Sequence, residues 1–195
     1  MIYFVKSLKY TLTAFLIIIN KNLFIKHTLE FIMESVSINR LKLKELREKW
    51  ISENALYGSV ADSEYLQLFQ EKNNVVIPGD LMEYFKSLNG TEGEYTDDLY
   101  EFYAVDRIAK VKDEFKNSGD VPDYKSLLKV KDISELYVFA NFTFDLFAYA
   151  IKLYPYFSDK NEVYVLCGEK YQKIADSFSD FIELYLNDAR VLYFG

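Results

Sequence analysis

The chain contains one histidine and one cysteine, the two residue types that most often provide nucleophilic or zinc-binding chemistry. His27 and Cys167 lie far apart in the sequence, and neither a CxxC nor an HExxH spacing occurs. The sequence therefore favours neither a Cys-His catalytic pair nor a zinc site. Cys167 follows the apolar run 163–166, where a lone thiol is typical of a small buried hydrophobic residue. We predict no catalytic residue, no metal site and no cofactor.

Carboxylates form the densest group of side chains that could do chemistry. Such groups can act as a general acid and base or bind calcium, but their spacing here does not match the EF-hand loop and nothing else marks a glycosidase. On an exposed connection they could instead pair with basic residues of a partner, while neighbouring tyrosines add aromatic contact area. The alternative is a solvated loop without a partner. The predicted partner-binding residues are Glu92, Glu94, Tyr95, Asp97, Asp98, Tyr100 and Glu101.

Composition limits the classes of protein to consider. The 195 residues are half hydrophobic and 17% aromatic, which predicts a densely packed domain and excludes a disordered chain. A formal charge of -7 and a pI near 4.9 argue against direct binding of nucleic acid or anionic lipid, because both ligands are negatively charged. A single cysteine cannot form an internal disulfide, which fits a reducing cytoplasm. We therefore expect a cytoplasmic, acidic protein.

The first 32 residues differ from the rest of the chain. They carry four lysines against one glutamate, so residues 33–195 hold all of the acidic excess. The apolar stretch 10–19 resembles the core of a signal peptide but lacks a small-residue cleavage pattern, and it is too short to cross a bilayer. We treat residues 1–32 as an extension and residues 33–195 as the domain. One hypothesis is that translation starts at Met33.

Helical periodicity marks several elements that must position the acidic residues. Apolar stripes predict amphipathic helices over residues 43–51, with Trp50 in the core, and over the segment after residue 62. Asp80 is placed to cap a helix ending near Asn89-Gly90, with Glu83 at the reciprocal capping-box position. A short helix is expected from Asp106. The last helix follows the cap Ser177 and shows an unbroken apolar stripe: Phe178, Phe181, Ile182, Tyr185 and Leu186.

The second half of the chain changes to the short, aromatic-rich runs of β-strands. Strands are expected over residues 99–105, 137–144, 146–153 and 162–167, separated by turn residues. The run 147–151 is apolar on both alternating faces, which favours a central strand covered on each side. The predicted fold is α+β: one domain with a largely antiparallel mixed sheet flanked by helices, N-terminal helices and a C-terminal amphipathic helix.

The order of these pieces resembles the SUKH superfamily, which joins fungal cell-wall-synthesis regulators of the Smi and Knr type to bacterial immunity proteins. The resemblance covers roughly residues 45 to 188, and the segment 115–137 departs from it. The motifs that carry it are Ile77-Pro78 with Asp80-Leu81, Asn89-Gly90, Phe139-Ala140, and Ile174-Ala175-Asp176-Ser177-Phe178. It implies a mixed α/β domain whose common bacterial role is to bind and neutralise a cognate polymorphic toxin.

The leading hypothesis is therefore an immunity protein that acts by stoichiometric occlusion and turns over no substrate. The acidic charge would complement a basic toxin domain such as a nuclease. The first alternative is a regulatory scaffold of the Smi and Knr type that docks onto cellular enzymes or signalling proteins. A carboxylate-dependent hydrolase ranks last, because paired acids alone do not specify a site. The oligomeric state and the sheet edge that would bind a partner stay open.

Overall fold

A computed structural model describes residue 25 and residues 39–55, 59–117 and 122–194. Residues Arg40–Gly195 form one compact unit. Apart from Ile25, the extension 1–32 and Met33 lie outside the described residues, so the hypotheses about this segment stay predictions. Within the compact unit, residues 40–52 are helical. The other helices are α2 (Ser63–Asn73), α3 (Gly79–Ser87), α4 (Val111–Glu114), η1 (Leu127–Lys129), α5 (Lys131–Ser134), α6 (Phe178–Leu186) and η2 (Arg190–Tyr193).

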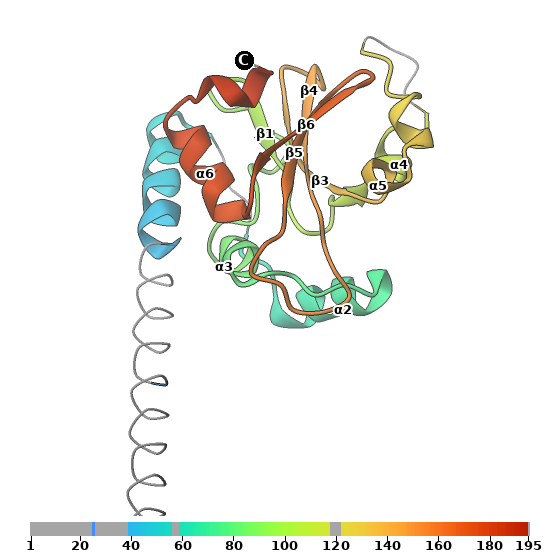
Figure 1. Ribbon diagram of the computed structural model, residues 1–195. Helices are drawn as coiled ribbons and strands as arrows, with labels where there is room; N and C mark the ends of the chain where they lie inside the picture. Colours follow the sequence, from blue (N-terminus) through green and yellow to red (C-terminus); the bar gives the residue numbers. More distant parts are fainter. Residues whose placement is uncertain (1–24, 26–38, 56–58, 118–121, 195) are drawn as a thin grey trace, which may run out of the picture. The chain divides into compact units, whose positions relative to one another are not determined.

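One antiparallel sheet forms the centre of the unit (Figure 1). Its order is β1-β3-β4-β5-β6, and the short β2 pairs with β3 beyond the end of β1. This architecture confirms the predicted α+β class. The strands are β1 (Tyr100–Phe102), β2 (Ala109–Lys110), β3 (Tyr137–Phe142), β4 (Phe147–Ile151), β5 (Val163–Cys167) and β6 (Lys170–Ala175).

Strand β4 lies in the middle of the sheet, and four of its five residues are buried, as the apolar run predicted. In Figure 1, α6 and helical residues 40–52 lie on one side of the sheet, and α4 and α5 lie on the other. A strand covered on both faces has no solvent side, which explains why its sequence lacks the usual polar alternation.

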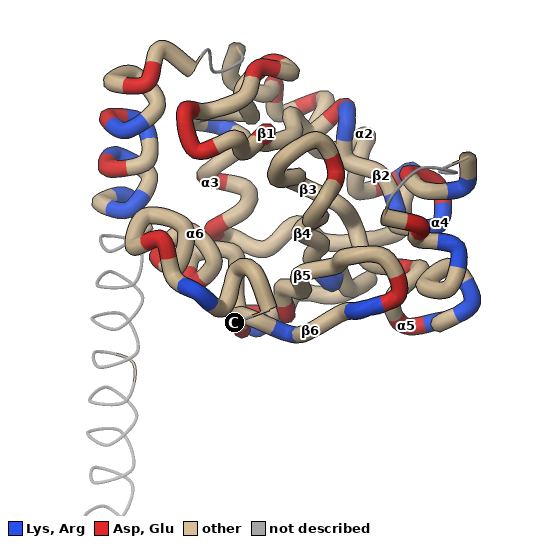
Figure 2. Tube along the Cα trace, turned by 90° about the horizontal axis from the view of Figure 1, so that it is seen from above, with Lys and Arg blue, Asp and Glu red and all other residues tan. Residues whose placement is uncertain are grey.

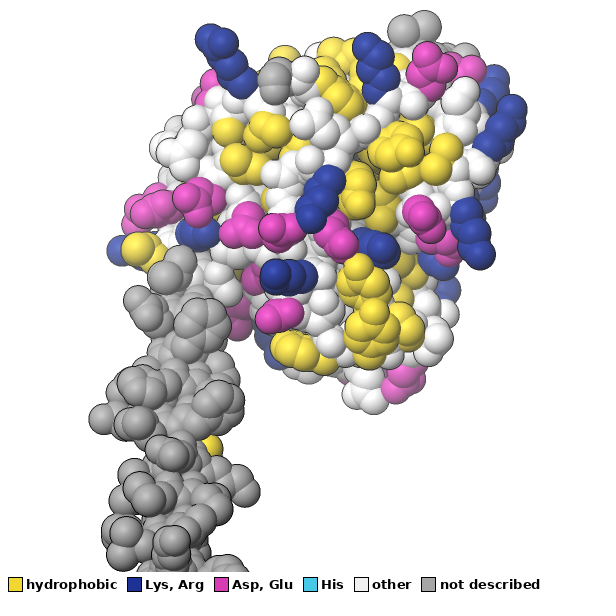
Figure 3. Space-filling model, in the orientation of Figure 1, with side chains coloured by type: hydrophobic (Ala, Val, Ile, Leu, Met, Phe, Trp, Pro, Cys, Tyr) yellow, Lys and Arg dark blue, Asp and Glu magenta, His cyan; other side chains and the backbone are white. Residues whose placement is uncertain are grey.

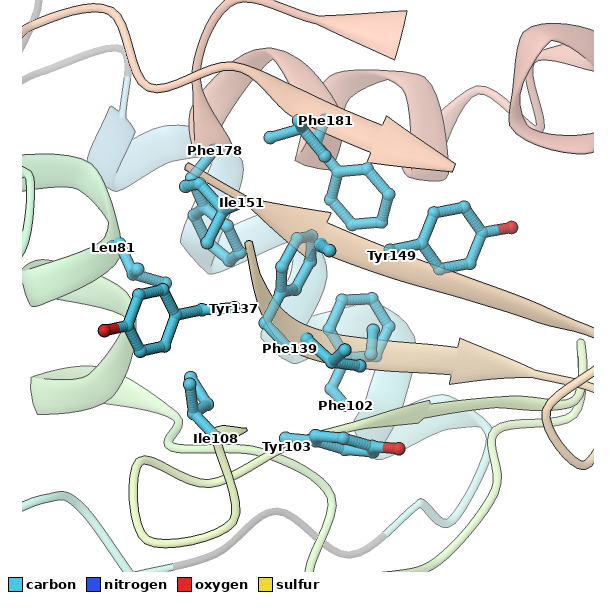
Figure 4. Packing of buried hydrophobic residues seen from close by; sticks show 14 of the residues in the cluster. Leu81, Phe102, Tyr103, Ile108, Tyr137, Phe139, Tyr149, Ile151, Phe178 and Phe181 are labelled. Carbon is cyan, nitrogen blue, oxygen red and sulfur yellow. The ribbon is translucent and has the colours of Figure 1, made fainter. Parts of the chain in front are cut away.

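The C-terminal helix provides much of the core, as its apolar stripe predicted. Its Phe181 ring packs edge-on against Phe139 with centroids 4.9 Å apart and contacts the Tyr149 ring at 5.1 Å (Figure 4). The predicted cap is confirmed, because the Ser177 hydroxyl oxygen accepts a hydrogen bond from the Asp180 amide at 3.1 Å. Trp50 is fully buried and packs on Phe102 with ring centroids 5.0 Å apart, which confirms its predicted core position.

Strand β6 was not expected from the sequence. Its first four side chains are exposed, so residues 170–173 show no apolar alternation. The strand forms because a tight turn at Gly168, with φ 57°, folds it back onto β5. Ile174 and Ala175 therefore end a strand, and the terminal helix begins only at Phe178.

The predicted capping role of Asp80 is wrong, and its actual role is long-range. Helix α3 begins two residues earlier than a cap at Asp80 would place it, directly after Pro78, and Glu83 forms an ion pair with Arg40 at 3.6 Å instead of closing a capping box. One Asp80 carboxylate oxygen accepts from the Leu81 amide at 2.8 Å, and the other accepts from the Ser179 amide at 2.8 Å. Asp80 thus provides an acceptor for an amide in the first turn of α6 and joins two helices.

Replacing Asp80 with alanine is expected to lower the free energy of unfolding by about 2 kcal/mol, because the Ser179 amide loses its acceptor in a part-buried position. Urea denaturation measures this loss. Asp62→Ala is the matched control: it removes the cap of α2, an exposed local bond from Glu64, and should cost only about 1 kcal/mol. An equal or smaller loss for Asp80→Ala would contradict the long-range role.

Candidate protein-binding surface

Four of the five predicted acidic residues lie on a loop that covers the outer edge of β1, and the fifth, Glu101, lies in β1 itself. We call residues 91–99 the acidic loop. Two backbone hydrogen bonds fasten it, from the Thr91 amide to the Phe102 carbonyl at 3.0 Å and from the Thr96 amide to the Tyr100 carbonyl at 2.8 Å. The side chains of the same threonines accept hydrogen bonds from β1. The Thr91 hydroxyl oxygen accepts from the Phe102 amide, and the Thr96 hydroxyl oxygen accepts from the Tyr100 amide. Both threonines are buried. The loop is thus held like an additional edge segment of the sheet.

Replacing Thr91 with valine tests this anchorage. The hydroxyl also donates to the Glu94 carbonyl at 2.6 Å, so the isosteric change removes the side-chain partner of two backbone groups, this carbonyl and the Phe102 amide. We expect a loss of about 1–3 kcal/mol in stability and faster amide exchange at Phe102 in hydrogen–deuterium exchange. Ser52→Ala, which removes an exposed local bond to the Lys49 carbonyl, should change neither. Unaltered exchange at Phe102 would contradict the anchoring role.

The structure divides the predicted partner-binding residues into two groups. Tyr95 is half-buried, and four carboxylates of the acidic loop are exposed: Glu92, Glu94, Asp97 and Asp98. Tyr100 and Glu101 are buried, with exposures of 1% and 6%. In Figure 2, acidic residues gather on the loop next to β1. The surface that a partner can reach therefore consists of the loop residues and not of the strand that follows.

Among the four exposed carboxylates of the acidic loop, Asp98 forms an ion pair with Lys49. Its oxygen lies 2.6 Å from the Lys49 ammonium, which also contacts Glu53. Burial acts to lower the pKa of Lys49, but the hydrogen bonds to Asp98 and Glu53 outweigh it and raise the pKa above its ordinary value. The lysine stays charged and ties the acidic loop to helical residues 40–52.

Tyr100 is a core residue. Its hydroxyl donates to the Tyr193 hydroxyl at 2.9 Å and receives a hydrogen bond from Tyr149 at 3.3 Å. Its ring packs edge-on against Tyr185 with centroids 4.9 Å apart. Burial raises the pKa of Tyr100, so the phenol stays protonated at neutral pH. This tyrosine joins β1 to the C-terminal segment and is not available to a partner.

Glu101 belongs to a partly buried ionic cluster on the other face of β1. Its carboxylate accepts from the Asn141 side-chain amide at 2.6 Å, across the register of β1 and β3. Arg107 lies over the Tyr103 ring at 3.8 Å and contacts Glu101 at 3.9 Å. The same guanidinium lies 3.5 Å from Glu114, which also accepts from the Tyr103 hydroxyl at 3.2 Å. The cluster was not predicted from the sequence, because the spacing of its residues carries no recognisable motif.

The internal partners of the ionic cluster indicate a structural role. Burial raises the pKa of Glu114, although Arg107 and Tyr103 counteract that rise. Glu101 and Arg107 also line an open hollow of about 540 Å³ together with Glu92. In the part of the chain that the structure describes, no three His, Cys, Asp or Glu residues are placed to hold a metal ion. The charged side chains of the cluster therefore pair with one another and with neighbouring polar groups of the fold.

At the opposite edge of the sheet, strand β6 pairs only with β5 among the described strands, and it carries exposed Lys170 and Lys173. Lysines on an edge strand discourage pairing with other chains. On the face seen in Figure 3, acidic, basic and hydrophobic side chains are interspersed. Within the acidic loop, by contrast, every charged residue is acidic.

The comparison with family models gives the class of the protein. The model of the SMI1 / KNR4 family (SUKH-1) matches residues 60–184, a range that begins before α2 and ends within α6. The chain belongs to this family, which confirms the resemblance drawn from the sequence. No curated protein matches the chain. None of the helices in the described residues is long and apolar enough to span a membrane.

Proposed function

We propose that this protein is a cytoplasmic immunity protein that binds a bacterial toxin one to one and neutralises it by covering its functional surface. Membership of the SMI1 / KNR4 family (SUKH-1) supports a protein partner. The observation that carries the proposal is the acidic loop, where four exposed carboxylates stand on a backbone fixed to β1. A preorganised loop loses little conformational entropy on binding, which favours tight association.

The charge of the loop points to a basic toxin. A domain that binds nucleic acid, such as a nuclease, carries lysine and arginine to neutralise phosphates. The carboxylates of the acidic loop could pair with those same basic residues and so block access of the substrate. Complementary charge also speeds the encounter between the two proteins and suppresses wrong partners. Neutralisation would then require occlusion alone and no chemical step.

Calorimetric titration tests the proposal. We expect a toxin gene beside this chain's own gene, and the probe is the C-terminal domain of that toxin, purified as an inactive variant. We expect one-to-one binding with a Kd of about 1–100 nM at low salt and clearly weaker binding at about 0.5 M salt. Absence of binding at micromolar concentrations would contradict the proposal. Specific binding to several cellular enzymes or signalling proteins instead would favour the regulatory scaffold.

A further inference from the structure

An exposed apolar group lies beside the acidic loop, at the turn between β3 and β4. Phe144 is 71% exposed, and Leu99 and Leu146 next to it are also exposed. The Tyr95 ring of the acidic loop packs on the Phe144 ring with centroids 4.7 Å apart, and the Thr143 amide donates to the Leu99 carbonyl at 2.9 Å. These contacts join loop and turn into one surface, which we call the aromatic patch: Tyr95, Leu99, Phe144 and Leu146.

The backbone of this patch is unusual. Thr143, Phe144 and Asp145 have φ values of 51°, 54° and 65°, and Leu99 has a φ of 65°. Left-handed backbone is costly for side chains other than glycine, and more so for a β-branched threonine. The Tyr124 hydroxyl holds the turn by donating to the Asp145 carbonyl at 2.8 Å. Folding alone would favour glycine or asparagine at these positions.

Packing does not explain why a phenylalanine occupies the tip of the turn. The Phe144 side chain is mostly in water, and its ring contact with Tyr95 is its one aromatic contact within the described residues. Strained conformations that persist in a folded protein concentrate at binding and active sites. Exposed aromatic residues are also the side chains that most often dominate protein interfaces.

We infer that Phe144 is the anchor of the toxin-binding surface. It would insert into an apolar socket on the basic partner, with Leu99 and Leu146 beside it. The carboxylates of the acidic loop would form the charged rim that pairs with lysine or arginine around the socket, the arrangement of apolar centre and polar rim found in stable interfaces. This inference rests on the proposed function, since the charge of the rim selects the same basic partner.

The variant Phe144→Asn separates binding from folding. Asparagine tolerates the left-handed backbone, so the Tm should stay equal or rise, whereas loss of the ring should raise the Kd for the toxin domain by about thirtyfold or more. Phe157→Asn is the matched control, because Phe157 is 74% exposed in the β4–β5 connection. It should change the Kd by less than about threefold, as expected of a residue outside the interface.

The outcomes distinguish the anchor from the proposed function. If the unaltered chain does not bind the toxin domain, the proposed function fails and the anchor fails with it. If the unaltered chain binds and Phe144→Asn binds equally well, only the anchor is overturned. A lower Tm for Phe144→Asn would contradict the argument that folding alone disfavours phenylalanine here. A dimer of the chain alone that Phe144→Asn dissociates in sedimentation would assign the aromatic patch to self-association and overturn the inference.

Discussion

Replacing Glu92, Glu94 and Asp97 together with lysine is expected to weaken binding of the basic toxin domain by about a hundredfold at low salt. All three side chains are exposed on the acidic loop, so the change reverses the surface potential without disturbing the core. Most of the effect should fall on the association rate, because long-range attraction steers the encounter. Asp98 is left unchanged, since its ion pair with Lys49 holds the loop in place.

A second triple variant controls for net charge. Glu64, Asp159 and Glu169 are exposed carboxylates on α2, in the β4–β5 connection and in the β5–β6 turn. Their replacement with lysine alters the net charge of the chain by the same amount, but should change the Kd by only a few-fold. Surface plasmon resonance at two salt concentrations compares the variants. Equal loss of affinity for both triples would mean that net charge, and not the acidic loop, governs binding.

Gly90→Ala should cause the largest loss of stability, about 3 kcal/mol or more, because two costs add. Gly90 has a φ of 89°, a conformation unfavourable for alanine. A Cβ atom there would also lie 2.6 Å from the Ala104 amide nitrogen and 2.7 Å from the Phe102 carbonyl oxygen. Both contacts are with the backbone, so no side chain can move aside. Glycine at this position therefore lets the backbone between α3 and the acidic loop lie close to the backbone of residues 102–104.

The variant Gly93→Ala measures the conformational cost in stability without the steric cost that is added at Gly90. Gly93 has a φ of 84°, but a Cβ atom there would have no neighbour within 4 Å. We expect it to lose only about 1 kcal/mol, measured by urea denaturation alongside Gly90→Ala. Equal losses for the two variants would show that the steric contact at Gly90 relaxes, and the argument for close backbone approach would then be wrong.

The sequence predicted those elements whose apolar pattern directly reflects their packing. The stripe of α6 faces the sheet, and the apolar run of β4 lies at its centre. Strand β6 escaped prediction because its pairing with β5, and not its own side chains, makes it a strand. The role of Asp80 was not predicted for a related reason: its partner Ser179 lies 99 residues away, and capping rules consider only neighbouring residues.

The candidate site was predictable only in part. The exposed carboxylates follow from the local density of charge, whereas the burial of Tyr100 and Glu101 depends on what covers both faces of β1. The aromatic patch was missed because residues 137–144 look like one continuous strand in the sequence. The left-handed turn that ends β3 at Phe142 and exposes Phe144 has no glycine to reveal it.

Protection of cells tests the central claim most directly. The active toxin domain is expressed from an inducible promoter together with the unaltered chain, the Glu92/Glu94/Asp97→Lys triple, or the control triple, and growth is followed after induction. The account predicts growth with the unaltered chain and the control triple, and arrest with the acidic-loop triple at equal protein levels. Arrest with the unaltered chain, or full protection by the acidic-loop triple, would contradict it.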